Sequence, residues 1–253
     1  MLIPGIQGRW EFMRPTADAL SPRFRVLPFS LRNDARSLDD YVAQVTDTLD
    51  RNGVDRAVIT GVSFGGLVAL RFAALHPNRT RALVLASTPT SRLNLRRRHQ
   101  LYVRLPWVLG PLFLIETPWR LRAELVAALP DARERFSFKW RAFRTAFSAP
   151  VSLSRMAERA LLMASTDLRA DCAHIKAPTL VVTGERELDH VVPVDGTTEY
   201  ARLIAGARTA VLERTGHIGT MTRPHAFADL VDSFVNPQPA IRNPQYKGPD
   251  AAA

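Results

Sequence analysis

A serine between glycines is the residue in this chain best suited to covalent chemistry. Ser63 lies in Gly61-Val62-Ser63-Phe64-Gly65-Gly66. A bare G-x-S-x-G occurs by chance in many chains, so the neighbouring segments decide its meaning. Residues 56–60 predict a buried strand, and the apolar LVALRFAALHP predicts a helix. A tight turn between a strand and a helix exposes a nucleophilic serine at the helix N-terminus, where developing negative charge is favoured. The alternative is a glycine turn whose serine only caps the helix.

A serine hydroxyl is a weak nucleophile at neutral pH and needs a base, for which histidine has a suitable pKa. His217 lies in Thr215-Gly216-His217-Ile218-Gly219, a glycine-flanked loop directly after the last predicted strand. Ligands of open α/β sheets bind at the carboxyl ends of the strands, so this loop is well placed to act on Ser63. The alternative interpretation is that His217 lies in a turn and has no catalytic role. Three other histidines, His76, His99 and His225, are better explained as surface residues.

An acidic residue is needed to orient the histidine. Where a nucleophilic serine lies between a strand and a helix of an α/β fold, this acid is expected between the serine and the histidine along the chain. No Asp or Glu follows the strand at residues 81–87 until Glu116. The loop after the next strand, residues 184–193, carries Glu185, Glu187 and Asp189. The residue types and positions by themselves do not decide which of these three carboxylates orients His217.

Alternating strand and helix patterns predict the scaffold that brings these residues together. A helix begins at Ser37 with a capping box to Asp40, and another begins at Pro224. Strands joined by helices indicate an α/β fold with a mostly parallel sheet and helices on both faces. The predicted strands are 2–3, 24–27, 56–60, 81–87, 179–183 and 209–212.

A long segment without strand alternation separates the strands at 81–87 and 179–183. We expect it to be a helical cap over residues 91–176, between core segments 1–90 and 177–235. Residues 236–253 are polar and rich in proline, which predicts a flexible tail. The apolar cap residues are expected to hold the cap together rather than to line an acyl pocket; they are Leu101, Trp107, Leu112, Phe113, Leu114 and Trp119.

At these motifs the chain resembles the α/β-hydrolase superfamily, in particular its capped serine-hydrolase branch of carboxylesterases, lactonases and C–C hydrolases, over Met1 to about Val235. The resemblance implies a triad of Ser63, His217 and an acid. The position of the acid in this loop depends on the end from which the family's spacing is counted. Counted back from Pro193 the acid is Asp189, which we prefer, and counted forward from Gly184 it is Glu187. It also implies an oxyanion hole formed by the backbone N–H groups of Ile6 and Phe64, without a metal or an organic cofactor.

Compared with that family, the chain starts within the strand before the loop Pro4-Gly5-Ile6-Gln7-Gly8. The first two strands of the fold are therefore expected to be absent. Either the sheet is shortened, or the start codon was placed too far downstream.

We expect a hydrolase that cleaves a carboxylic ester or a related carbonyl group in a small or medium apolar acyl substrate. A C–C hydrolase, a haloperoxidase or an acyltransferase could use the same residues, because the fold does not determine the reaction. A non-catalytic ligand-binding module on this scaffold is the alternative from a different class.

Composition limits the partners and the location. The net charge of +10 arises mainly from arginines spread along the chain, so a solvated basic surface is expected and no nucleic-acid partner. The run Arg96-Arg97-Arg98 could touch an anionic substrate or a membrane surface, but the solvated reading is preferred. The single cysteine, Cys172, predicts a small buried residue. With no signal peptide and no apolar stretch long enough to span a bilayer, a cytoplasmic location is expected.

Overall fold

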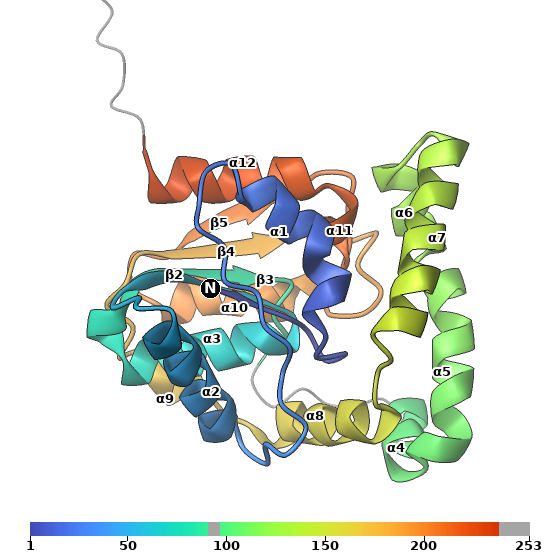
Figure 1. The fold of residues 1–253 in the computed structure, drawn as a ribbon, viewed down its shortest axis with the longest axis horizontal. Coiled ribbons are helices and arrows are strands. Elements are labelled where there is room, and N and C mark those ends of the chain that lie inside the picture. Colours follow the sequence, from blue (N-terminus) through green and yellow to red (C-terminus); the bar gives the residue numbers. More distant parts are fainter. Residues whose placement is uncertain (91–96, 238–253) are drawn as a thin grey trace, which may run out of the picture.

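The structure is a computed structural model that describes residues 1–90 and 97–237, apart from the side chains of 97–99 and 113–115. Its described residues form one five-stranded sheet in the order β1-β2-β3-β4-β5, and every adjacent pair is parallel. The predicted parallel sheet is therefore confirmed (Figure 1). Its strands are β1 (Leu2–Ile3), β2 (Ala57–Val62), β3 (Thr80–Ala86), β4 (Thr179–Thr183) and β5 (Arg208–Val211).

The strand predicted at residues 24–27 is wrong. This segment lies beside β1, where the amide of Leu2 donates to the carbonyl oxygen of Leu27 at 3.0 Å, but the pairing ends in an isolated bridge between Leu2 and Pro28. Proline has no backbone N–H to continue a ladder, and β1 offers only two residues as a partner.

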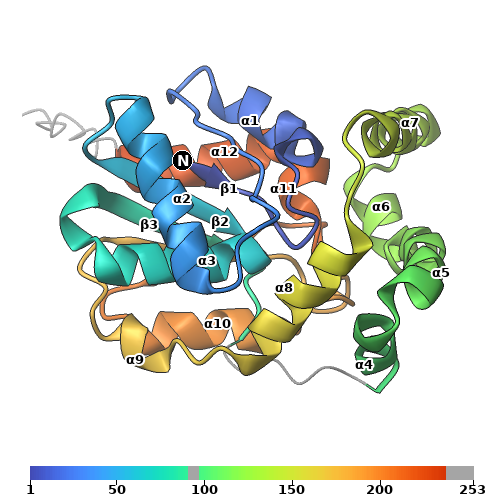
Figure 2. The same ribbon diagram turned by 60° about the horizontal axis from the view of Figure 1, so that its bottom comes forward.

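Helices cover both faces of the sheet, as predicted (Figures 1 and 2). One face carries α1 (Arg14–Leu20), α11 (Gly219–Thr222) and α12 (Pro224–Val235). The opposite face carries α2 (Leu38–Arg51), α3 (Phe64–Leu75), α9 (Arg169–Cys172) and α10 (Val194–Leu203). Each face buries its own apolar cluster, so the sheet is a rigid support for the loops at its strand ends.

Local sequence signals explain the best predicted helix. Ser37 is the N-cap of α2, and its side chain and that of Asp40 form the reciprocal capping box. The apolar face of α2, spaced at helical intervals, is buried, and α2 packs against α3. The described residues also form two short 3₁₀ helices, η1 (Trp10–Met13) and η2 (Pro77–Arg79).

Between β3 and β4 the chain forms helices that stand beside the sheet as a separate layer (Figures 1 and 2). They are α4 (Arg97–Arg104), α5 (Pro106–Arg120), α6 (Arg122–Ala128), α7 (Ala132–Ser148) and α8 (Leu153–Ser165), and α8 leads back to the core. No helix within the described ranges is long and apolar enough to cross a membrane.

The apolar residues of the cap do not hold it together as expected. Trp107 and Trp119 are each 73% exposed, and Leu101 and Leu112 are also exposed. The reason is that these helices form a single layer, so their outer faces have no second layer to pack against. The side chains of Phe113, Leu114, Arg97 and Arg98, with Arg96 and the tail from residue 238 onward, lie outside the described residues.

Candidate active site

Ser63 occupies a strained turn between β2 and α3. It is the N-cap of α3 with φ 54° and ψ −123°, a left-handed region that is unfavourable for a residue with a Cβ atom. The neighbouring glycines make the turn possible, because a Cβ at Gly65 would lie 2.4 Å from the carbonyl oxygen of Ile3. A Cβ at Gly61 would lie 2.2 Å from the carbonyl oxygen of Gly65. The strand and the helix can therefore approach closely while the Ser63 hydroxyl stays at the helix N-terminus.

His217 reaches Ser63 from the loop after β5. Its Nε2 lies 3.2 Å from the Ser63 Oγ, although the two residues are 154 positions apart in the chain. The loop is held at both sides of the histidine. The Thr215 hydroxyl donates to the carbonyl oxygen of Leu212 at 2.6 Å, and Gly216 packs so tightly that a Cβ there would lie 2.3 Å from the carbonyl oxygen of Leu188.

Asp189 lies on the other side of the imidazole. Its Oδ1 accepts hydrogen bonds from the amides of Val191 and Val192 at 3.0 and 2.9 Å, which fixes the carboxylate. Its Oδ2 lies 3.5 Å from His217 Nδ1, within ion-pair range, although Nδ1 makes no hydrogen bond in this structure. Such contacts are often long before substrate binds. Burial raises the pKa of Asp189, but His217 and the two amides outweigh it, so this pKa lies below its ordinary value.

The two competing carboxylates point elsewhere. Glu185 Oε1 accepts the amide of Arg214 at 2.6 Å, and Glu187 is exposed to solvent. Of the three acids left open by the loop sequence, Asp189 is the one that the structure brings to His217.

The loop of residues 4–8 passes beside Ser63. A Cβ built on Gly5 would lie 3.4 Å from the Ser63 Cβ, and the amide of Gly8 donates to the carbonyl oxygen of Gly5 at 2.9 Å. The residues predicted for the oxyanion hole, Ile6 and Phe64, thus lie in two turns that meet at the serine. An oxyanion would need donors about 3 Å from its position, and backbone N–H groups of such turns are typical donors.

Arg159 on α8 holds the same loop, and sequence reasoning missed it. Arg159 is 3% exposed, and its guanidinium donates to the carbonyl oxygen of Ile6 and to the Tyr41 hydroxyl, both at 3.0 Å. It also reaches the carbonyl oxygens of Leu31 and Arg32 at 3.4 and 3.3 Å. The helix α8 carries two arginines, Arg155 and Arg159, and no sequence signal marks the second as the buried one.

Glu124 on α6 connects the cap to the histidine loop and was also missed. It is 1% exposed, and its Oε1 accepts the amide of Ile218, next to His217, at 2.9 Å. Burial raises its pKa to about 7, although the amides of Gly216 and Ile218 and the nearby His217 act in the opposite direction. Nothing in the local sequence of α6 marks this carboxylate as buried.

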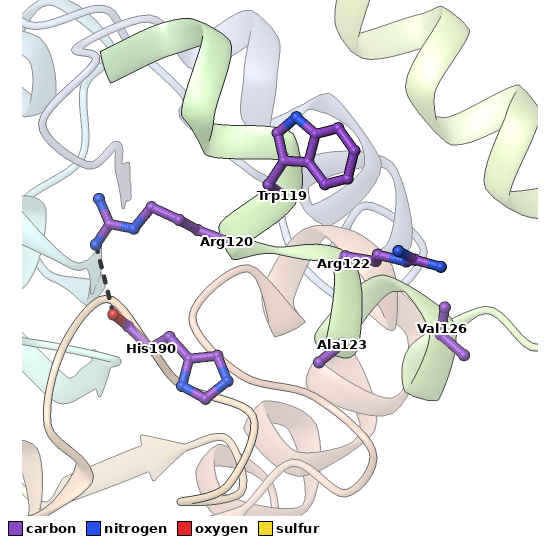
Figure 3. A pocket seen from close by; sticks show the side chains of 6 residues that line it. All are labelled: Trp119, Arg120, Arg122, Ala123, Val126 and His190. Carbon is purple, nitrogen blue, oxygen red and sulfur yellow. Dashed lines mark hydrogen bonds between the residues drawn. The ribbon is translucent and has the colours of Figure 1, made fainter. Parts of the chain in front are cut away.

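A pocket of about 680 Å³ opens between the end of α5, the start of α6 and the loop after β4 (Figure 3). The carbonyl oxygen of His190, which follows Asp189, accepts a hydrogen bond from Arg120 at 3.5 Å. The pocket borders the loop of the acid without containing Ser63 or His217. Its lining combines apolar and cationic side chains, namely Trp119, Arg120, Arg122, Ala123, Val126 and His190.

The fold and this arrangement define a class of protein. The sequence profile described as "Alpha/beta hydrolase family" matches residues 1–230, so the chain belongs to the alpha/beta hydrolase family, in agreement with the resemblance found in its motifs.

Among its relatives, a protein named putative carbamate hydrolase RutD from Yersinia enterocolitica is 24% identical, over 93% of this chain and 86% of its own length. The 2-hydroxymuconate semialdehyde hydrolase of Pseudomonas putida is 27% identical, over 80% of this chain and 70% of its own. The crystal structure of an enol-lactonase from Burkholderia xenovorans LB400 superposes with a TM-score of 0.76 at 24% identity. It covers 92% of this chain and 89% of the lactonase chain, which shows the shared fold.

Proposed function

We propose that this protein is a serine hydrolase that cleaves a carboxylic ester or a related carbonyl substrate through Ser63, His217 and Asp189. The observation that carries the proposal is the 3.2 Å contact between His217 Nε2 and the Ser63 hydroxyl in a strained, helix-capping turn. A serine that merely capped α3 would direct its oxygen at the backbone of the first turn, whereas Ser63 makes no side-chain cap hydrogen bond.

The reaction follows from the positions of these groups. His217 Nε2 takes the hydroxyl proton as the Ser63 oxygen attacks the carbonyl carbon, and the amides of Ile6 and Phe64 stabilise the oxyanion. Collapse of the tetrahedral intermediate breaks the bond to the alcohol, which leaves with the proton from His217. The acyl-enzyme is then hydrolysed by water, with His217 again as base, to release the acid and restore the serine.

Asp189 supplies orientation rather than a proton. With Oδ1 bound to two amides, its Oδ2 faces His217 Nδ1 and favours the tautomer that carries the proton there. The lone pair of Nε2 is then directed at Ser63. The same carboxylate stabilises the imidazolium that forms during attack.

A small or medium apolar acyl group is the substrate class that we favour. The supporting observation is the pocket beside the acid loop, whose wall combines Trp119 and Val126 with two guanidinium groups. Such a lining suits an apolar body with a polar or anionic end. A carbamate, which the name of the Yersinia relative mentions, is a related carbonyl substrate.

Active-site labelling with a fluorophosphonate tests the proposal. The native protein should be labelled at Ser63, and Ser63→Ala should not react, while Ser21→Ala, an exposed serine, is the matched control. Turnover of p-nitrophenyl esters of increasing acyl length should then show an optimum and vanish in Ser63→Ala. Labelling no stronger than that of Ser63→Ala would indicate a non-catalytic binding module.

A C–C bond hydrolase is the second candidate, because the Pseudomonas relative is named as a semialdehyde hydrolase. The same Ser63 and His217 would serve, but the bond broken would be C–C, and the leaving carbanion would take the proton from His217. Assaying a vinylogous 1,5-diketone beside the esters separates the two. A kcat/KM for the diketone above that for every ester would favour this candidate.

A further inference from the structure

The helix α7 presents an aromatic stripe to solvent. Phe136, Trp140, Phe143 and Phe147 recur at intervals of three and four residues, so they share one face. They are 70%, 52%, 53% and 75% exposed. Three of the rings touch in sequence, with centroid distances of 5.6 Å between Trp140 and Phe143 and 4.8 Å between Phe143 and Phe147. At 1.5 Å per residue the stripe from Phe136 to Phe147 is about 16 Å long.

The rest of α7 does not use this stripe for packing. None of its 17 residues is buried, and the half-buried positions, among them Phe138 and Ala142, lie on a different face. The element that α7 contacts most is η1, and both views show the helix at the outer edge of the cap (Figures 1 and 2). Exposed large aromatic residues in a row are unfavourable in water, which indicates a partner surface.

The charges around the stripe indicate which partner. The helix carries one acidic residue, Glu134, and five basic residues, Arg133, Arg135, Lys139, Arg141 and Arg144. At helical spacing Lys139 borders one side of the stripe and Arg144 the other. A second copy of this chain is a poor partner, because the two positive surfaces would repel each other and each chain has a net charge of +10. An anionic, apolar partner fits both features.

We propose that the α7 stripe binds the surface of an anionic lipid membrane. The four aromatic rings enter the boundary between headgroups and acyl chains, and the flanking Lys139 and Arg144 contact the lipid phosphates. This is the geometry of an interfacial amphipathic helix lying in the membrane plane, with an aromatic apolar face and a basic polar face. The proposal does not depend on the hydrolase reaction, because the stripe contains none of the residues of the candidate active site.

Vesicle co-sedimentation of the full chain tests this proposal. The protein should pellet with phosphatidylcholine vesicles that contain about 30% phosphatidylglycerol, bind pure phosphatidylcholine weakly, and dissociate as salt screens the charges. Trp140→Asp/Phe143→Asp should weaken binding more than about tenfold by removing the apolar insertion. Lys139→Glu/Arg144→Glu should weaken it comparably while leaving every aromatic ring in place.

Leu161→Asp is the matched control, because this residue is an exposed leucine on α8 outside the stripe, and its binding should equal that of the native protein. Circular dichroism and urea unfolding show that each variant is folded, and the charge pair still tests the proposal if the aromatic pair does not fold. Absence of binding to anionic vesicles would overturn the proposal. So would equal binding by all variants, or a dimer in light scattering that Trp140→Asp/Phe143→Asp dissociates without any vesicle binding.

Discussion

Replacing Asp189 by asparagine tests whether this carboxylate orients His217, the base of the proposed reaction. The amides of Val191 and Val192 bind Oδ1 at 3.0 and 2.9 Å, and the asparagine Oδ1 can accept the same two bonds. The asparagine NH₂ group then takes the place of Oδ2, 3.5 Å from His217 Nδ1. Because NH₂ is a donor, it favours the tautomer with the proton on Nε2, which cannot take the proton of Ser63.

The expected loss in kcat is about 10³- to 10⁴-fold, or about 4 to 5.5 kcal/mol at 1.36 kcal/mol per tenfold. KM should change little, since Asp189 does not touch the substrate. Stopped-flow hydrolysis of a p-nitrophenyl ester measures both constants, and urea unfolding checks that the side-chain exchange leaves the fold intact.

Glu187→Gln is the matched control in the same loop, because Glu187 is exposed and lies away from the imidazole. Its kcat should stay within about twofold of the native value, as for surface substitutions in general. The reasoning is refuted if Asp189→Asn retains kcat within tenfold, or if Glu187→Gln shows the larger loss.

Three further predictions concern the contacts around the site. Glu124→Gln should remove a pH dependence of stability, because burial raises the pKa of Glu124 from 4.5 to about 7. Between pH 5 and pH 8 the free energy of unfolding of the native protein should therefore fall by about 2 to 3 kcal/mol relative to that of the variant, as measured by urea unfolding. A constant difference across this range would contradict the burial of the charge. Arg159→Met should leave the carbonyl oxygen of Ile6 and its other acceptors without a donor, costing about 3 kcal/mol of stability and lowering kcat more than it changes KM; an unchanged kcat would mean that Arg159 does not position the loop. Gly65→Ala should destabilise the fold by more than about 3 kcal/mol and abolish labelling, whereas Gly53→Ala, at φ 62° in open space, should cost about 1 kcal/mol; similar melting temperatures for the two variants would count against the close approach at Gly65.

Local patterns in the sequence were sufficient for most of the scaffold. The capping box at Ser37 predicts the start of a helix, and the apolar runs predict the buried strands. Both signals are local, so they can be read without knowing the tertiary structure. The strand at residues 24–27 was wrong because strand formation depends on a partner, and Pro28 beside a two-residue β1 cannot continue the pairing.

The cap was less predictable than the core. The absence of strand patterns predicts its helices. The exposure of Trp107 and Trp119 could not be predicted in this way, because exposure depends on whether another layer of the structure covers these side chains. The same holds for the stripe on α7, whose residues would suit a buried helix equally well.

The sequence by itself predicted the kind of chemistry, since a serine in a glycine-rich turn and a histidine in a glycine-flanked loop have the required reactivity, and each of these segments directly follows a strand. Only the tertiary structure decided which acid faces that histidine, because three carboxylates within five residues differ in direction and not in type. It also decided that Arg159 and Glu124 are buried beside the site. A side chain's burial and partners are set by segments far away in the chain, and no local pattern encodes them.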